Sequence, residues 1–305
     1  MWKARANTGY KTTGAMVRLV IKRGDDEQFL YETSTSEKLD DTISNICTIF
    51  NGRLKVLRLV SEFSELAQHG IALPPEMVGL TEDQVTDLKL QDSQADIAVP
   101  SGGFQMHADP LGRRNGRAPK DNMVQVLTKA RDEAAAIVAK DQARAGVPLT
   151  ERVVAEALSI LRGATMIVYP MGLPPYDPVR MELENREDLS GTQASLQVMD
   201  PGLAQLWFSG KEMLRGKTLA DYIGKNEKTK LVVKLQKKGQ GAPGREPLMT
   251  EEEQKKLMAA EFRRQEELKR LERDLDDTHL SSPWADSGVL KRQFHGLNNV
   301  SWGPR

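Results

Sequence analysis

An alternation of apolar and charged side chains opens the ordered part of the chain. In residues 16–22, apolar side chains recur at every second position, which is the period of a half-buried strand. The turn residues Gly24-Asp25-Asp26 follow, and a second short strand is predicted over residues 28–33. Ser34 and Glu37 have the spacing of a capping box, in which side chains satisfy free amides at a helix start. The pattern predicts two strands followed by a helix.

Two helices are predicted after these strands. Apolar side chains recur at helical spacing between residues 39 and 50, and Asn51-Gly52 is typical of a helix end. A second amphipathic helix is predicted over residues 54–70. We therefore expect an N-terminal ββαα unit over residues 16–90, preceded by a polar, disordered extension of residues 1–15.

The middle of the chain is predicted to be a linker followed by helices. Prolines and glycines interrupt any periodicity from residue 91 to residue 120, which indicates a linker. Residues 121–162 form a helical segment, with one helix over 122–143 and a second over 151–161. Gly163 is the expected end of the second helix.

Strands are predicted to return after Gly163. Residues 164–169 (ATMIVY) have the composition of a strand, and residues 179–184 (VRMELE) alternate like its antiparallel partner. The proline-rich segment between them is expected to be a rigid hairpin loop, with a polyproline ligand as the alternative.

Residues 205–235 resemble the back half of a ubiquitin-like β-grasp domain. A strand ending in LWFSGK, a turn at LRGKT, a helical turn LADYI and a closing strand TKLVVKL follow in that order. The front half matches less well, because the helix expected near residues 187–198 contains Gly191 and few apolar side chains. We expect a β-grasp domain over residues 163–240, and APGREP beyond Gly241 leaves no free diglycine end.

The C-terminal part is predicted to be one charged helix and a tail. Thr250 and Glu253 form a second capping box, and opposite charges recur four residues apart over 249–277. The tail, residues 278–305, is loop-like but carries three aromatic side chains, Trp284, Phe294 and Trp302. The predicted fold class is therefore α+β: a β-grasp domain with helical insertions, a preceding ββαα unit and a C-terminal charged helix.

Composition points to a soluble protein of a reducing compartment. Lys and Arg number 43, as do Asp and Glu, so no net field favours a nucleic acid or a membrane surface. Cys47 is the single cysteine, which excludes an internal disulfide. No apolar stretch approaches the roughly 20 residues of a spanning helix, and residues 1–15 contain no apolar signal core.

Catalytic and metal-binding patterns are missing from the sequence. The four histidines are scattered and have no ligand spacing, so we expect no metal and no cofactor. Between Gly210 and Gly216 lie five residues, one more than a phosphate-binding P-loop allows, and no long helix is predicted after them. A strand–turn–strand is the preferred interpretation. We expect a protein that is not an enzyme.

The candidate binding residues lie on the predicted sheet. Trp207 and Val232 are expected on its exposed face, where an aromatic beside an aliphatic side chain is typical of a partner patch. The equal alternative is that the helices of residues 120–162 cover this face. Lys230 and Lys234 belong to a basic run that contacts an acidic partner or is simply solvated. The tail aromatics dock on a partner or fold back, and folding back is preferred for Trp284.

Several phrases resemble the Kurly family of cilia- and flagella-associated proteins from about Met16 to Arg305. The matching phrases are MIVYPMGLPPYDP, ENREDLSGTQ, GKNEKTK, GQGAPGREP, RRQEELKRLE, SPWAD and FHG. The departure is the extension of residues 1–15, because family members begin near Met16. The resemblance implies a role in cilium motility, in dynein arm assembly in the cytoplasm, and in planar cell polarity.

We therefore expect a non-enzymatic adaptor located in the cytoplasm and at the cilium or basal body. Its expected partners are dynein arm assembly factors or axonemal dynein subunits, and possible further partners are polarity-signalling proteins. The alternative is a structural, microtubule-associated component of the axoneme.

Overall fold

The computed structural model describes residues 16–244 and 251–281. Their contacts divide the chain into two units, residues 1–245 and residues 246–305. The first unit has an α+β fold around a five-stranded mixed sheet, which confirms the predicted fold class. In the second unit the described residues form one helix, α9 (Glu251–Ser281), which continues four residues beyond its predicted end at residue 277.

The sheet has the strand order β2-β1-β7-β5-β6. β1 runs parallel to β7, and the other neighbours are antiparallel. The strands of this sheet are β1 (Val17–Arg23), β2 (Asp26–Thr33), β5 (Ala204–Phe208), β6 (Lys211–Glu212) and β7 (Lys230–Lys237). The sheet therefore joins the N-terminal hairpin to strands that come more than 170 residues later in the chain.

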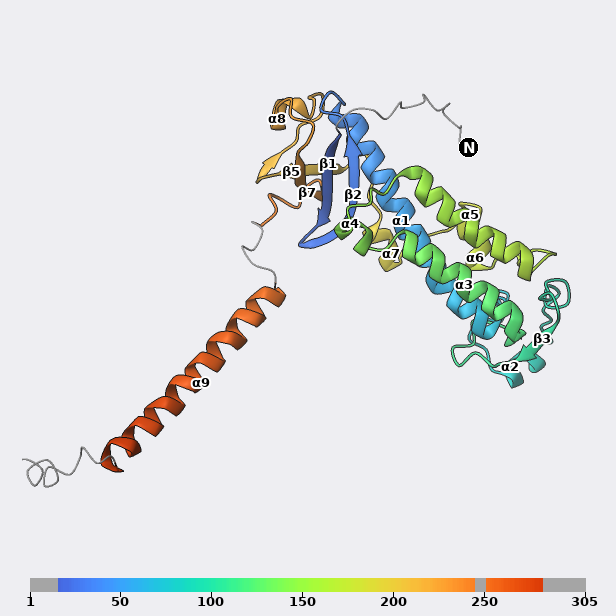
Figure 1. Ribbon diagram of the computed structural model, residues 1–305. Coiled ribbons are helices and arrows are strands. Elements are labelled where there is room, and N and C mark those ends of the chain that lie inside the picture. The colour runs from blue at the N-terminus through green and yellow to red at the C-terminus, as the bar shows by residue number, and fades with distance from the viewer. Residues whose placement is uncertain (1–15, 245–250, 282–305) are drawn as a thin grey trace, which may run out of the picture. The chain divides into compact units, whose positions relative to one another are not determined.

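A single helix, α1 (Leu39–His69), runs from the sheet through the first unit (Figure 1). The prediction of two helices separated at Asn51-Gly52 is wrong, because both residues serve tertiary contacts within the continuing helix. The Asn51 side chain accepts from the Met199 amide at 2.8 Å and donates to the Met199 carbonyl at 2.7 Å. A Cβ on Gly52 would lie 2.8 Å from Cγ1 of Val154, so the glycine allows another helix to approach.

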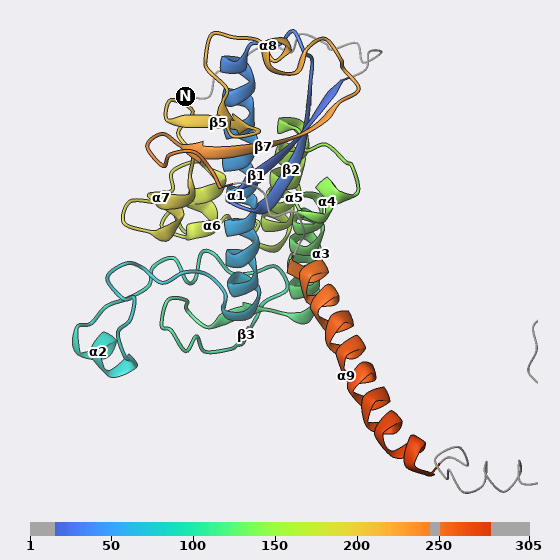
Figure 2. The ribbon, with the colours of Figure 1, turned by 90° about the vertical axis from the view of Figure 1, so that its left-hand side faces the viewer.

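Two long helices pack along α1, away from the sheet (Figure 2). These are α3 (Asp121–Ile137) and α5 (Glu151–Val168). The shorter helices are α2 (Glu82–Asp87), α4 (Asp141–Arg144), α6 (Pro178–Leu183), α7 (Gln193–Gln197) and α8 (Ala220–Ile223). α2 begins at a complete capping box formed by Thr81 and Gln84.

The strands predicted after Gly163 are wrong. α5 continues through Gly163 to Val168, because Leu161, Ala164 and Val168 recur at helical spacing and are buried in the core. Residues 179–184 fall largely in α6, which begins at the side chain of Asp177 and has proline at its first position. The apparent alternation there is one helical turn with one buried side.

The predicted linker of residues 91–120 packs against the C-terminal end of α1. It contains the hairpin of β3 (Phe104–Met106) and β4 (Arg117–Pro119). Arg114 is buried and donates to the Gly70 carbonyl at 2.8 Å. A Cβ on Gly70 would lie 2.2 Å from the Arg117 carbonyl oxygen, which explains glycine at the end of α1. These contacts make residues 91–120 part of the first unit.

The predicted separation of an N-terminal unit from a domain over residues 163–240 is also wrong. The back-half elements are present as β5, β6, α8 and β7, but the expected front half is helical. β1, β2 and α1 supply the remaining strands and the covering helix of the same sheet. The sequence did not indicate that these early and late elements share one sheet, because residues 70–203 lie between α1 and β5.

The Gly52 contact gives a direct test of the continuous α1. Gly52→Ala is expected to lower the free energy of unfolding by about 1 kcal/mol, because overpacking typically costs about 1–3 kcal/mol and exceeds the helix-propensity gain. Val154→Ala in the Gly52→Ala background should cost less than it does alone, with a coupling of about 1 kcal/mol. Urea unfolding of the four proteins measures this coupling.

Gly163→Ala is the matched control, since Gly163 is also inside a helix but a Cβ there meets nothing within 4 Å. This change should stabilise the protein by up to about 1 kcal/mol. Additive effects of the Gly52 and Val154 changes would contradict the close packing of α1 on α5.

Candidate functional site

The five-stranded sheet has one face against α1 and one facing away from it, here called the outer face. Leu206 and Phe208 pair with Leu235 and Val233 on the inner face, and most of these side chains are buried. Trp207 alternates with them and lies on the outer face. The predicted assignment of strand faces is therefore confirmed.

The β1–β2 part of the outer face is covered by the short helix α4. Val20 and Leu30 are opposite each other in the register and form a separate buried cluster with Ala143 of α4. Val232 on β7 is next to Val20, yet its side chain remains 36% exposed. The alternative that helices of residues 120–162 cover this face therefore holds only for α4 over the β1–β2 part. The longer helices α3 and α5 pack on α1 instead.

Trp207 is less exposed than the sequence predicts. Its side chain is half-buried, and its indole Nε1 is fully enclosed without a hydrogen-bond acceptor. It lies directly opposite Lys234 in the β5–β7 register. Trp207 therefore contributes packing to the outer face as well as a partly exposed ring.

Lys234 is held by intramolecular contacts. Its side chain is 8% exposed, and Nζ lies 3.2 Å from Oδ1 of Asp25 and 3.1 Å from the Gly244 carbonyl oxygen. The chain after β7 thus returns to this lysine. The structure leaves Lys230, at the start of β7, exposed.

The exposed part of the outer face is a small apolar centre with a basic rim, here called the sheet patch: Val232, Lys230, Arg18 and the ring of Trp207. Arg18 is opposite Lys230 in the parallel register and pairs with Glu32 at 2.9 Å. No carboxylate lies within salt-bridge distance of Lys230 in the part of the chain that the structure describes. This arrangement suits contact with an apolar side chain that is accompanied by an acidic one.

The other candidate residues fall elsewhere. Trp284, Phe294 and Trp302 lie outside the described residues. α9 belongs to the second unit, and its apolar side chains Leu257, Phe262 and Leu268 are more than half exposed. The structure therefore brings together Trp207, Val232, Lys230 and Lys234, of which Lys234 is not free.

Among the described residues, no group of three or more His, Cys, Asp or Glu side chains could hold a metal ion. His69 and His107 are distant in sequence but lie with their Nδ1 atoms 3.2 Å apart, and within 16–244 and 251–281 no third ligand joins them. Burial raises the pKa of the Cys47 thiol to about 11, which leaves it a poor nucleophile. The two glycines with P-loop-like spacing both serve turns. Ser209 and Gly210 form the tight turn between β5 and β6, and the Gly216 amide donates to the Asp40 side chain.

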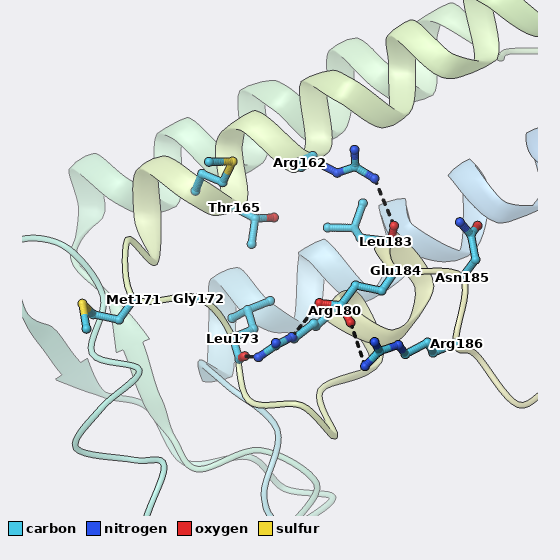
Figure 3. A pocket seen from close by; sticks show the side chains of 11 residues that line it. Arg162, Thr165, Met171, Gly172, Leu173, Arg180, Leu183, Glu184, Asn185 and Arg186 are labelled. Atoms are coloured by element: carbon cyan, nitrogen blue, oxygen red, sulfur yellow. Dashed lines mark hydrogen bonds and ion pairs between the residues drawn. The ribbon is translucent and has the colours of Figure 1, made fainter. Parts of the chain in front are cut away.

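A groove between α5 and α6 was not predicted from the sequence (Figure 3). It has a volume of about 700 Å³ and is lined by the end of α5, the loop after it and the turn after α6. Arg162 reaches across it from α5 and donates to the Leu183 carbonyl at 3.0 Å. Arg180 and Arg186 approach Glu184 from both sides, at 2.9 and 3.3 Å. Expecting strands at 164–169 and 179–184 concealed this grouping.

Two charged contacts hold the turn after α6 against α1. Lys55 donates to Oδ1 of Asn185 at 2.7 Å and to Oε1 of Glu187 at 3.0 Å. Arg58 donates to Oε1 of the buried Glu182 at 2.6 Å. The side chains that contact α1 (Glu182, Asn185 and Glu187) thus alternate with Glu184 and Arg186, which line the groove.

Comparison with known proteins gives a consistent result. The family model described as Cilia- and flagella-associated protein 298 matches residues 204–300. A zebrafish (Danio rerio) protein of that name is 57% identical over 290 residues, which are 95% of this chain and all of the relative. The human protein is 57% identical with the same coverage, and the Drosophila melanogaster protein is 53% identical over 93% of this chain and 98% of its own.

No solved structure matches the chain. Within the described residues, none of the helices combines the length and apolarity needed to cross a bilayer. Because these relatives are more than half identical to the chain over nearly its whole length, the chain belongs to the cilia- and flagella-associated protein 298 family.

Proposed function

We propose that this protein is a non-enzymatic adaptor that binds other proteins during the assembly of motile cilia. Family membership supports the association with cilia and flagella. The sheet patch supports the adaptor role, because it exposes apolar surface on a rigid central strand with basic groups around it. Its partners would be dynein arm assembly factors or axonemal dynein subunits.

The fold supports a protein-binding role in a second way. β1, β2 and α1 precede a long insertion, and β5, β6, α8 and β7 follow it. We propose that these parts form a ubiquitin-like β-grasp fold interrupted by residues 70–203. Such a fold would display the sheet patch outward while α1 supports the sheet from its other face.

The place of action would be the cytoplasm, before the dynein arms enter the cilium, with a further presence at the basal body. The alternative is a structural component bound to axonemal microtubules. The exposed lysines near β7, Lys225, Lys228 and Lys230, favour this alternative because tubulin surfaces are acidic. The two functions differ in where most of the protein is found.

Fractionation of ciliated cells separates the two functions. An assembly factor should be found mainly in the cytosol, and its removal should leave axonemes without dynein arms in electron micrographs. The same cells re-expressing the full chain are the control. Retention of most of the protein on detergent-extracted axonemes, with release only at high salt, would contradict the assembly role and support microtubule binding.

Charge reversal in the sheet patch tests the binding surface. The double variant Lys230→Glu/Val232→Glu should reduce the dynein subunits and assembly factors that co-purify with the protein at least fivefold, since it places two carboxylates in the centre of the contact. Its melting temperature should fall by no more than a few degrees, because Lys230 is exposed and Val232 is 36% exposed. Quantitative mass spectrometry of the purified complexes measures the loss.

Lys225→Glu is the control for reversing a lysine outside the contact, because Lys225 is exposed in the loop before β7 and is not part of the sheet patch. Trp207→Ala is a poorer probe, since its half-buried ring makes a loss of stability expected. Unchanged co-purification in the folded double variant would exclude the sheet patch as the partner surface.

A further inference from the structure

We infer that the groove between α5 and α6 binds an acidic peptide segment that carries an apolar side chain next to its carboxylates. This inference deepens the proposed adaptor function by naming the partner chemistry at a second surface, and it rests on that function. The groove is lined by Arg162, Arg180 and Arg186 and by a single carboxylate, Glu184. In a chain whose charges balance overall, this is a local excess of positive charge.

The guanidinium groups keep donors for a ligand. A guanidinium has five N–H donors in a planar fork that fits a carboxylate. Arg162 donates to the Leu183 carbonyl, and Arg186 is 75% exposed and reaches Glu184 at 3.3 Å. Arg180 holds the pKa of Glu184 below its usual value, so this carboxylate is ionised and already occupied. Both side chains line the groove and keep N–H donors beyond these contacts (Figure 3).

The groove also offers an apolar contact. Met166 and Met171 line it and are 67% and 74% exposed. Exposed methionines are unbranched and adaptable, and they suit contact with varied apolar side chains. Leu173 also lines the groove and is buried, so a packed apolar side chain accompanies the exposed methionines.

The position of the arginines is fixed by contacts that a ligand need not break. The Arg162–Leu183 bond spans α5 and α6, and Arg180 donates to the Leu173 carbonyl at 2.7 Å. The turn after α6 is tied to α1 through Lys55. Such prior ordering lowers the entropy cost of binding.

Fluorescence polarisation with the full chain tests the inference. The probe is a fluorescein-labelled ten-residue peptide in which Glu and Asp alternate with Leu and Phe. We expect saturable binding that weakens as salt rises from 50 to 300 mM. The Arg162→Gln/Arg186→Gln variant should weaken binding at least tenfold, and Met171→Ser at least threefold. Arg152→Gln, an exposed change in the first turn of the same helix, should change the dissociation constant less than twofold.

Three outcomes would overturn the inference. These are equal binding of a peptide with Gln and Asn in place of the acids, equal binding by a folded Arg162→Gln/Arg186→Gln variant, and tighter binding of a phosphoserine peptide. The sheet patch variant must bind the probe normally, so failure of the groove and failure of the adaptor function are distinguishable.

Discussion

The burial of α1 along its whole length is the constraint on which the first unit depends. Its N-terminal half packs against the inner face of the sheet, and its C-terminal half packs against α3, α5 and the hairpin β3–β4. Buried side chains such as Ile46, Phe50, Leu59 and Phe63 therefore belong to one continuous core. Because this core spans both halves, the insertion of residues 70–203 is an extension of the sheet domain and not a separate domain.

A few polar contacts set the order of elements around this helix. Arg53 is buried, and it donates to the Val138 carbonyl and to Gln28 at 2.8 Å each, which joins α1 to the end of α3 and to β2. Arg114 joins the C-terminal end of α1 to the loop before β4, and its Nη1 lies 3.7 Å from the fully buried Asp177. A buried guanidinium without its hydrogen-bond partners would be costly, so these contacts favour one arrangement of the insertion.

The two candidate surfaces follow from these constraints. The sheet patch exists because α4 covers only the β1–β2 part of the outer face, which leaves Val232 accessible. The groove exists because Lys55 and Arg58 hold the turn after α6 against α1, so that Arg186 points outward. Both surfaces combine apolar and basic groups, and both are compatible with acidic, partly apolar protein partners.

Elements whose periodicity is local were predictable from the sequence. The strands at residues 17–33, the strands β5 and β7, and the strongly periodic helices α3 and α9 were predicted, as was the face of Trp207 and Val232. The other features depend on contacts between segments that are distant in the sequence. Asn51 and Gly52 look like a helix end, yet contacts with Met199 and Val154 keep α1 continuous. Gly163 also lies inside a helix, because burial of its neighbours outweighs its low propensity. The joining of β1 to β7 and the gathering of three arginines link positions far apart along the chain, and no local pattern records such contacts.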